Sequence, residues 1–174
     1  MKAKNRRLLP ILCVLLIAGQ GMAAELPTRP VLPLAMAVQA AEAALEQCRR
    51  NGYQVSAAVV DEDGVLLALL RADGAGVHTV DSSRRKAYTA ASMKAPTARF
   101  ADLIARLPQV QGLRDMNDSI LMLGGGLPIR MDGQVVGGIG VGGAPGAQLD
   151  EDCARAGLRR IGADASLPKP RPDG

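Results

Sequence analysis

The chain has 174 residues, with 21 Lys and Arg against 17 Asp and Glu. Aromatic residues make up 2% of it and tryptophan is absent, so most of the stacking surfaces that hold single-stranded nucleic acid are missing. The basic residues at positions 2, 4, 6 and 7 account for the whole charge excess, because without them the two signs balance at 17 each. A chain without net charge has no electrostatic footprint for nucleic acid, which excludes that class of function.

The first 23 residues have the pattern of a secretory signal peptide. Residues 2–7 include four basic residues, and residues 8–18 form an apolar run that is too short to be a stable membrane anchor. Gly21 and Ala23 supply the small residues of a cleavage site. We therefore predict cleavage after Ala23 or Ala24 and a periplasmic or secreted protein. The general secretory route fits the strongly apolar run, and the paired arginines leave the twin-arginine route open.

One domain is predicted over residues 34–163, between a Pro-rich leader at 24–33 and a disordered tail at 164–174. An amphipathic helix opens this domain and ends at Asn51-Gly52. Its apolar face follows a helical 4-3-4-3 spacing and consists of Leu34, Val38, Ala41, Leu45 and Cys48.

A hairpin and a second helix come next. Residues 53–60 and 65–71 read as strands on either side of an acidic turn with a glycine. Asp81 or Ser82 can cap the following helix, which is expected to run to about Met93.

Further elements complete the domain. A third helix is expected over residues 97–107, irregular chain over 109–118, and a short buried strand over 120–123. Asp150 is placed to cap a final helix over residues 151–161.

A glycine-rich hairpin lies between that short strand and the final helix. Residues 127–131 and 135–141 are apolar runs joined by Asp132-Gly133, a dipeptide that favours a tight primed turn. The second strand contains Gly137, Gly138 and Gly140. Glycine inside a strand indicates a bulge or the close approach of something flat or bulky.

The order of these elements predicts the fold class. Strands come as hairpins and helices are segregated from them, which indicates an α+β domain with a five-stranded antiparallel sheet flanked by helices.

The sequence contains no catalytic constellation. Residues 138–143 match G-x-G-x-x-G, but a dinucleotide site needs a helix directly after the glycines, and here the next helix begins only near Asp150. The acidic residues 61–63 read as a solvated turn, and no cysteines and histidines have metal-ligand spacing. These observations favour a protein that is not an enzyme.

His78 is the single histidine, in a glycine-rich loop before a basic segment. A lone loop histidine is by default a surface residue. Alternatively it is an iron ligand in a haem site, which needs an apolar slot and cations for the propionates. Arg85 and Lys86 are the candidate cations, and the glycines of the hairpin could admit a flat macrocycle. Methionines that could supply a second ligand are Met93, Met116, Met122 and Met131.

Several segments together resemble the GlcG/HbpS-like haem-binding family, which also occurs as the C-terminal domain of some cobalamin adenosyltransferases. They are residues 59–64, 71–74, 86–90, 125–129, 132–133 and 137–143, in the family's order, and the likeness spans roughly residues 34–161. The resemblance implies a profilin-like, GlcG-like fold, haem as cofactor, and a homo-oligomer. The chain departs from the family at Gly142, where many members have serine.

The resemblance favours an exported haem-binding protein for storage, sensing or delivery of haem, with a link to its degradation in some members. The alternatives are an accessory enzyme acting on a small oxidised metabolite such as a 2-hydroxy acid, and an oligomeric accessory protein without a ligand. His78 is the ligand that chemistry and position favour, and Tyr88 and Thr89 are its nearest competitors.

Cys48 and Cys153 are the cysteines of the mature chain, and an exported protein meets an oxidising compartment. Cys48 lies near the end of the first predicted helix, and Cys153 in the first turn of the last. If these helices pack antiparallel on one sheet face, the two thiols meet, so we predict a disulfide. Two separate buried thiols are the alternative.

Overall fold

The computed structural model describes residues 26–166. The predicted signal peptide and residues 167–174 of the predicted tail lie outside the described residues. The elements, in chain order, are α1 (Leu34–Arg50), β1 (Ser56–Asp61), β2 (Leu66–Arg71), α2 (His78–Met93), α3 (Thr97–Arg106), the 3-10 helix η1 (Pro108–Asp115), β3 (Gly126–Met131), β4 (Gln134–Gly142) and α4 (Ala147–Arg160).

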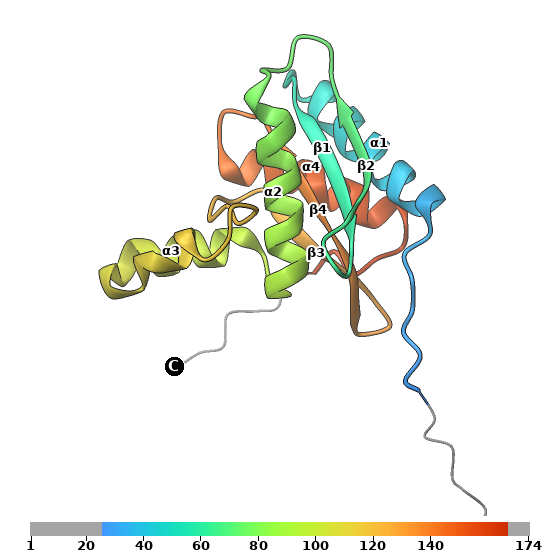
Figure 1. The fold of residues 1–174 in the computed structure, drawn as a ribbon. Coiled ribbons are helices and arrows are strands. Elements are labelled where there is room, and N and C mark those ends of the chain that lie inside the picture. Colours follow the sequence, from blue (N-terminus) through green and yellow to red (C-terminus); the bar gives the residue numbers. More distant parts are fainter. Residues whose placement is uncertain (1–25, 167–174) are drawn as a thin grey trace, which may run out of the picture.

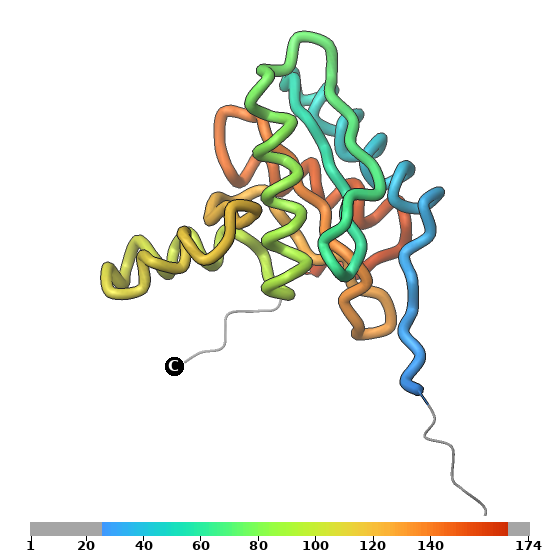
Figure 2. The backbone as a smooth tube through the Cα atoms, in the orientation of Figure 1, coloured from blue at the N-terminus to red at the C-terminus, as the bar shows by residue number. Residues whose placement is uncertain are grey.

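The strands form an antiparallel sheet with helices on both faces, which confirms the predicted α+β class. The sheet order is β2-β1-β4-β3. α1 and α4 cover one face and α2 covers the other, while α3 projects sideways from the body (Figures 1 and 2). No helix within residues 26–166 combines the length and apolar character needed to cross a bilayer.

The sheet has four strands among the described residues, so the predicted fifth strand is wrong. Residues 120–123 contain buried Ile120 and Met122, as expected, but they pair with no strand. The Leu121 N–H donates instead to Thr89 Oγ1 at 2.8 Å, and the Leu123 N–H donates to the Leu121 carbonyl at 3.0 Å. A helix side chain and a local turn satisfy these two donors, so neither is available to a strand ladder.

The glycine-rich hairpin forms as predicted. Asp132 and Gly133 have φ values of 49° and 77°, the left-handed backbone that a primed two-residue turn requires. The β3–β4 register shifts between Ile129 and Arg130, and this bulge lies beside the turn.

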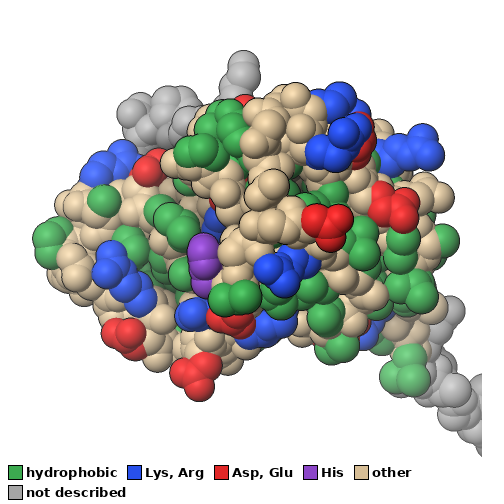
Figure 3. All heavy atoms as spheres, turned by 90° about the horizontal axis from the view of Figure 1, so that it is seen from above, with side chains coloured by type: hydrophobic (Ala, Val, Ile, Leu, Met, Phe, Trp, Pro, Cys, Tyr) green, Lys and Arg blue, Asp and Glu red, His purple; other side chains and the backbone are tan. Residues whose placement is uncertain are grey.

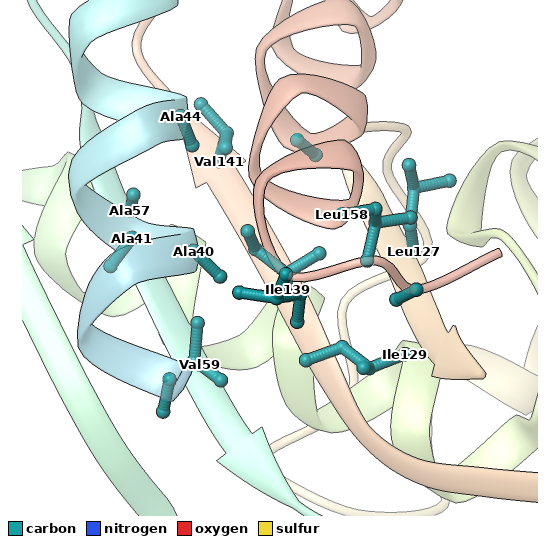
Figure 4. Packing of buried hydrophobic residues seen from close by; sticks show 14 of the residues in the cluster. Ala40, Ala41, Ala44, Ala57, Val59, Leu127, Ile129, Ile139, Val141 and Leu158 are labelled. Carbon is teal, nitrogen blue, oxygen red and sulfur yellow. The ribbon is translucent and has the colours of Figure 1, made fainter. Parts of the chain in front are cut away.

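The face of the sheet under α1 and α4 carries the main core. Alternate residues of the strands point to this face, as strand geometry dictates, and helix alanines pack against them (Figure 4). The largest fully buried members include Leu127, Ile129, Ile139 and Leu158. Gly157 lets α4 approach closely, because a Cβ there would lie 2.6 Å from the Ala40 carbonyl oxygen of α1.

A disulfide joins Cys48 of α1 to Cys153 of α4, which confirms the predicted pairing. The two Cα atoms are 5.5 Å apart, and both residues are fully buried. The bond therefore ties together the first and last helices of the domain on the same face of the sheet.

The opposite face is built from small residues. Gly138 and Gly140 of β4 face α2, and a Cβ at either position would overlap a helix carbonyl oxygen, that of Ala87 or Ser83 respectively. Gly126 of β3 is crowded in the same way by the Lys86 carbonyl. The prediction that these glycines admit a flat ligand is therefore wrong, since the helix itself occupies the space that they leave open.

Candidate functional site

α2 begins earlier than its capping residues suggested. The helix starts at His78, and Asp81 lies in its first turn. Because three or four residues make one helical turn, His78, Asp81 and Arg85 project from the same face. Together with Val77, which precedes the helix, they form what we call the α2 site.

His78 is exposed at the start of this face. Figure 3 shows the histidine at the surface, between hydrophobic and basic side chains. Its imidazole lies over Gly76, where a Cβ would stand 2.6 Å from Cε1. Val77 beside it is 80% exposed. An accessible imidazole nitrogen next to an exposed apolar side chain can bind a metal that is carried by a largely apolar ligand.

Arg85 lies on the same face and has bonding capacity to spare. Its Nη2 donates to the Ile120 carbonyl at 2.5 Å, and its Nη1 is 3.8 Å from an Asp81 carboxylate oxygen. Its Nε is buried and has no hydrogen-bond partner within residues 26–166. A guanidinium has a planar fork of five N–H donors, and the Arg85 side chain is 30% exposed, so a carboxylate can reach Arg85 only through donors other than the buried Nε.

Lys86 was a candidate cation, but its ammonium is committed inside the protein. Lys86 is 2% exposed, and its Nζ donates to Asp150 Oδ2 at 2.8 Å and to the Val141 carbonyl at 2.9 Å. Asp150 Oδ1 accepts the Ala144 N–H at 3.0 Å. Burial raises the pKa of Asp150 above its ordinary value, and the ammonium of Lys86 opposes that shift. This network joins α2 to β4 and α4.

Thr89 and Tyr88 are also engaged elsewhere. Thr89 is fully buried, and its hydroxyl donates to the Arg85 carbonyl and accepts the Leu121 N–H. Tyr88 is half-buried, and its ring fills the space above Gly64 in the β1–β2 turn. The Thr89 hydroxyl is therefore committed to the backbone, and the Tyr88 ring is packed against the β1–β2 turn.

Met93, at the end of α2, belongs to a separate apolar cluster. This satellite cluster is centred on Ile104, Ile120 and Met122 beneath α3 and η1. Met93 and Tyr88 pack against its edge and are half-buried. Met93 lies fifteen positions after His78, about four turns along the helix, so the structure does not bring these two residues together.

Asp81 is the member of the α2 site that sequence reasoning took only as a cap. It pairs with Arg84 at 3.0 Å as well as approaching Arg85. Asp81 follows His78 by three positions, and this spacing predicts a shared helix face only if the helix begins at His78. The partnership between Lys86 and Asp150 had no such signal, because 64 residues separate the two.

The architecture and this site define a class: a small α+β domain with an antiparallel sheet, helices on both faces, and an exposed histidine at the start of α2. The sequence model of one family, described as haem degrading protein HbpS-like, matches residues 32–159. The chain belongs to this HbpS-like family, which includes GlcG-related proteins.

Relatives agree with that assignment. Protein GlcG of Escherichia coli K12 is 34% identical over 116 residues, which cover 66% of this chain and 83% of GlcG. A crystal structure of a double mutant of Streptomyces reticuli HbpS is 44% identical with a TM-score of 0.72, over 82% of this chain and 97% of that one. The crystal structure of a PduOC:haem complex is 25% identical with the same TM-score, over 78% of this chain and 99% of that one. The family and these structures support a haem-related function.

Proposed function

We propose that the mature protein is exported and binds haem at the α2 site, for storage, sensing or delivery. In this proposal His78 is the iron ligand and Arg85 holds a propionate. The observation that carries it is the exposed imidazole of His78, beside an exposed Val77 and on the same helix face as the partly exposed guanidinium of Arg85. The PduOC:haem relative supports the choice of ligand class.

The side chains of the α2 site match the chemical needs of a haem. Haem, when bound, supplies an iron centre that accepts a neutral imidazole nitrogen and two carboxylates that require cations. His78 offers an imidazole that solvent already reaches, and Arg85 offers a charged donor two helical turns away. The exposed Asp81 carboxylate between them limits how much positive potential a propionate meets, so Arg85 contributes modestly.

The proposal is tested by titrating mature protein with hemin and recording the visible spectrum. His78→Ala is expected to shift the Soret maximum and weaken binding by roughly tenfold or more, because the iron loses its protein ligand. Arg85→Ala is expected to weaken binding only a few-fold, since a contact near solvent is screened. Ser92→Ala, an exposed change on the same helix, serves as the matched control and leaves both quantities unchanged.

The same preparation tests export. Protein taken from the periplasm is expected to begin at Ala24 or Glu25 by mass spectrometry. An unchanged spectrum and affinity in His78→Ala would contradict the assignment of the ligand. An intact Met1 species confined to the cytosol would contradict export.

A further inference from the structure

The chain on both sides of His78 is fixed to the sheet. Ser56 of β1 and Arg71 of β2 lie opposite each other in the β1–β2 ladder. Ser56 Oγ is 2.7 Å from Thr79 Oγ1, one residue after His78, and both hydroxyl residues are buried. Arg71 holds the preceding loop, because its Nε donates to the Ala75 carbonyl at 2.9 Å and its Nη2 donates to the same oxygen. One cross-strand pair therefore anchors the backbone before and after the histidine.

The loop between these anchors is open to solvent. Residues 73–74 and 76–78 are exposed, whereas Ala75 is 1% exposed. Its backbone bonds are local: the Ala75 N–H donates to the Ala72 carbonyl at 3.1 Å, and the Thr79 N–H donates to the Gly76 carbonyl at 3.0 Å. Exposed segments held by local bonds open easily, and a hydrogen bond from an ionised donor is stronger than a neutral one. The Arg71 guanidinium therefore contributes strongly to the position of the loop.

Gly76 provides the space in which the His78 ring lies. A Cβ at Gly76 would stand 2.6 Å from Cε1 of the imidazole, 2.9 Å from Nδ1 and 3.5 Å from Nε2. The φ of Gly76 lies outside the left-handed region, so the backbone does not require a glycine there. The ring turns its Nδ1–Cε1 side toward the loop, and Nε2 is the nitrogen farther from it. We call Gly76 and the contact between Arg71 and Ala75 the imidazole seat.

A fixed imidazole matters for metal binding. A ligand nitrogen that is already aimed binds more tightly, because binding does not then have to order the side chain. When only a fraction of the molecules hold the competent orientation, the apparent Kd rises by the inverse of that fraction.

We propose that Arg71 and Gly76 are positioning residues for His78. The Arg71 guanidinium fixes the loop through the Ala75 carbonyl, and Gly76 leaves room for the imidazole beside the backbone. Nε2 is then the nitrogen that binds the iron of a haem. The inference rests on the proposed function, since it describes how the same histidine is held.

NMR of the mature protein without added haem tests the imidazole seat directly. The chain has one histidine, so the ring signals have a single source. Arg71→Ala is expected to move the Cε1–H signal toward its position in the urea-unfolded chain, because the loop and the ring become mobile. Gly76→Ala is expected to shift the same signal by pushing the ring aside without backbone strain. Arg71→Lys keeps a cation but not the planar fork, and is expected to restore part of the wild-type signal.

Binding measurements test the consequence for the ligand. Arg71→Ala and Gly76→Ala are each expected to weaken hemin binding by roughly three- to tenfold, since fewer molecules hold the competent orientation. The Soret maximum is expected to stay at the wild-type position, because His78 is still the ligand. Zinc protoporphyrin, a diamagnetic analogue, identifies the bound nitrogen through the ¹⁵N signals of the ring, and Nε2 is expected.

Arg106→Ala is the matched control, because Arg106 Nε also donates to a backbone carbonyl four residues away, that of Asp102 at 3.3 Å on α3. Gly112→Ala is the control for replacing a glycine, since nothing lies within 4 Å of a Cβ there. Neither variant is expected to change the histidine signal or the hemin affinity. Circular dichroism verifies the fold of every variant.

Three results overturn the inference: an unchanged histidine signal in Arg71→Ala, zinc protoporphyrin bound through Nδ1, or equal losses of hemin affinity in Arg71→Ala and Arg106→Ala. Failure of the proposed function has a different signature. Wild-type protein would then not bind hemin, while its histidine signal would still respond to Arg71→Ala. In that case the imidazole seat is supported and the ligand that it serves is not haem.

Discussion

The two faces of the sheet hold their helices by different means. Under α1 and α4, large side chains such as Ile139 and Leu127 fill the space, and a disulfide links the two helices. Under α2, the buried apolar cluster consists of Ala58, Val60, Ala87 and Ala91, and glycines bring the helix backbone against the strands. One face is therefore stabilised mainly by burial of side chains, and the other by close contact of backbones.

This difference explains why the charged network lies on the α2 side. Because Gly126 and Gly140 allow α2 to approach the sheet so closely, the Lys86 side chain reaches the Val141 carbonyl and Asp150. A helix held farther away by larger strand residues would leave the ammonium in solvent. The small residues of one face thus create a position for a buried ion pair.

The largest expected effect comes from breaking that pair. Lys86→Ala leaves Asp150 buried without its cation, and we expect a loss of about 3–5 kcal/mol in the free energy of unfolding. Urea denaturation measures this loss. Arg84→Ala, which removes an exposed cation from the same helix, is expected to cost at most about 1 kcal/mol.

A double variant sharpens the test. Replacing both partners by apolar residues, as in Lys86→Met with Asp150→Leu, removes the unpaired charge and is expected to recover most of the loss. If Lys86→Ala and Arg84→Ala cost the same, the pair does not stabilise α2 against the sheet.

Reduction of the disulfide tests the other face. The bond spans a sequence separation of 105 residues, and its removal is expected to lower the free energy of unfolding by roughly 2–4 kcal/mol, because the unfolded chain regains freedom. Denaturation with and without dithiothreitol measures the effect. The variant with both Cys48→Ala and Cys153→Ala should match the reduced protein and not respond to dithiothreitol.

The smallest expected effects come from adding a methyl group on one face of the sheet and removing one from the other. Gly140→Ala adds a methyl where the Ser83 carbonyl already lies, and we expect a cost of about 1–3 kcal/mol. Ile139→Val removes a methyl from the opposite face and is expected to cost about 0.5–1.5 kcal/mol. Thermal unfolding measures both.

Gly112→Ala is the control for the backbone effect of losing a glycine, because nothing lies within 4 Å of a Cβ at that position. It should be close to neutral. If Gly140→Ala is also neutral, the backbone contact between α2 and β4 is not tight in solution.

Hydrophobic periodicity and turn chemistry were sufficient to predict most of the fold. The helical spacing of Leu34 to Cys48 predicted α1, and Asp132-Gly133 predicted the hairpin. The helix and the turn depend on neighbours a few residues apart in the sequence. The two cysteines pair as predicted, but the predicted cap at Asp150 is wrong: α4 begins at Ala147, which places Cys153 in its second turn. The antiparallel α+β class followed from the order of the elements.

The predictions that the structure contradicts failed because they depend on contacts between residues far apart in the sequence. Residues 120–123 have the apolar character of a strand, but the hydroxyl of Thr89, 32 residues earlier, takes the Leu121 N–H. The glycines of β4 signalled a close approach correctly, but the sequence could not tell a ligand from α2. At the candidate site, His78 and Arg85 could be chosen by residue type, whereas the engagement of Lys86 by Asp150 depends on tertiary contact.

The disulfide between α1 and α4 also closes most of the domain into a covalent ring. All four strands, α2 and α3 lie within the segment that Cys48 and Cys153 delimit. A single cut of the backbone in the exposed stretch around η1 therefore opens the ring without releasing a fragment. Such a nicked molecule keeps both halves of its sheet tethered, so in an oxidising compartment the fold can survive a proteolytic event that would divide the reduced chain in two.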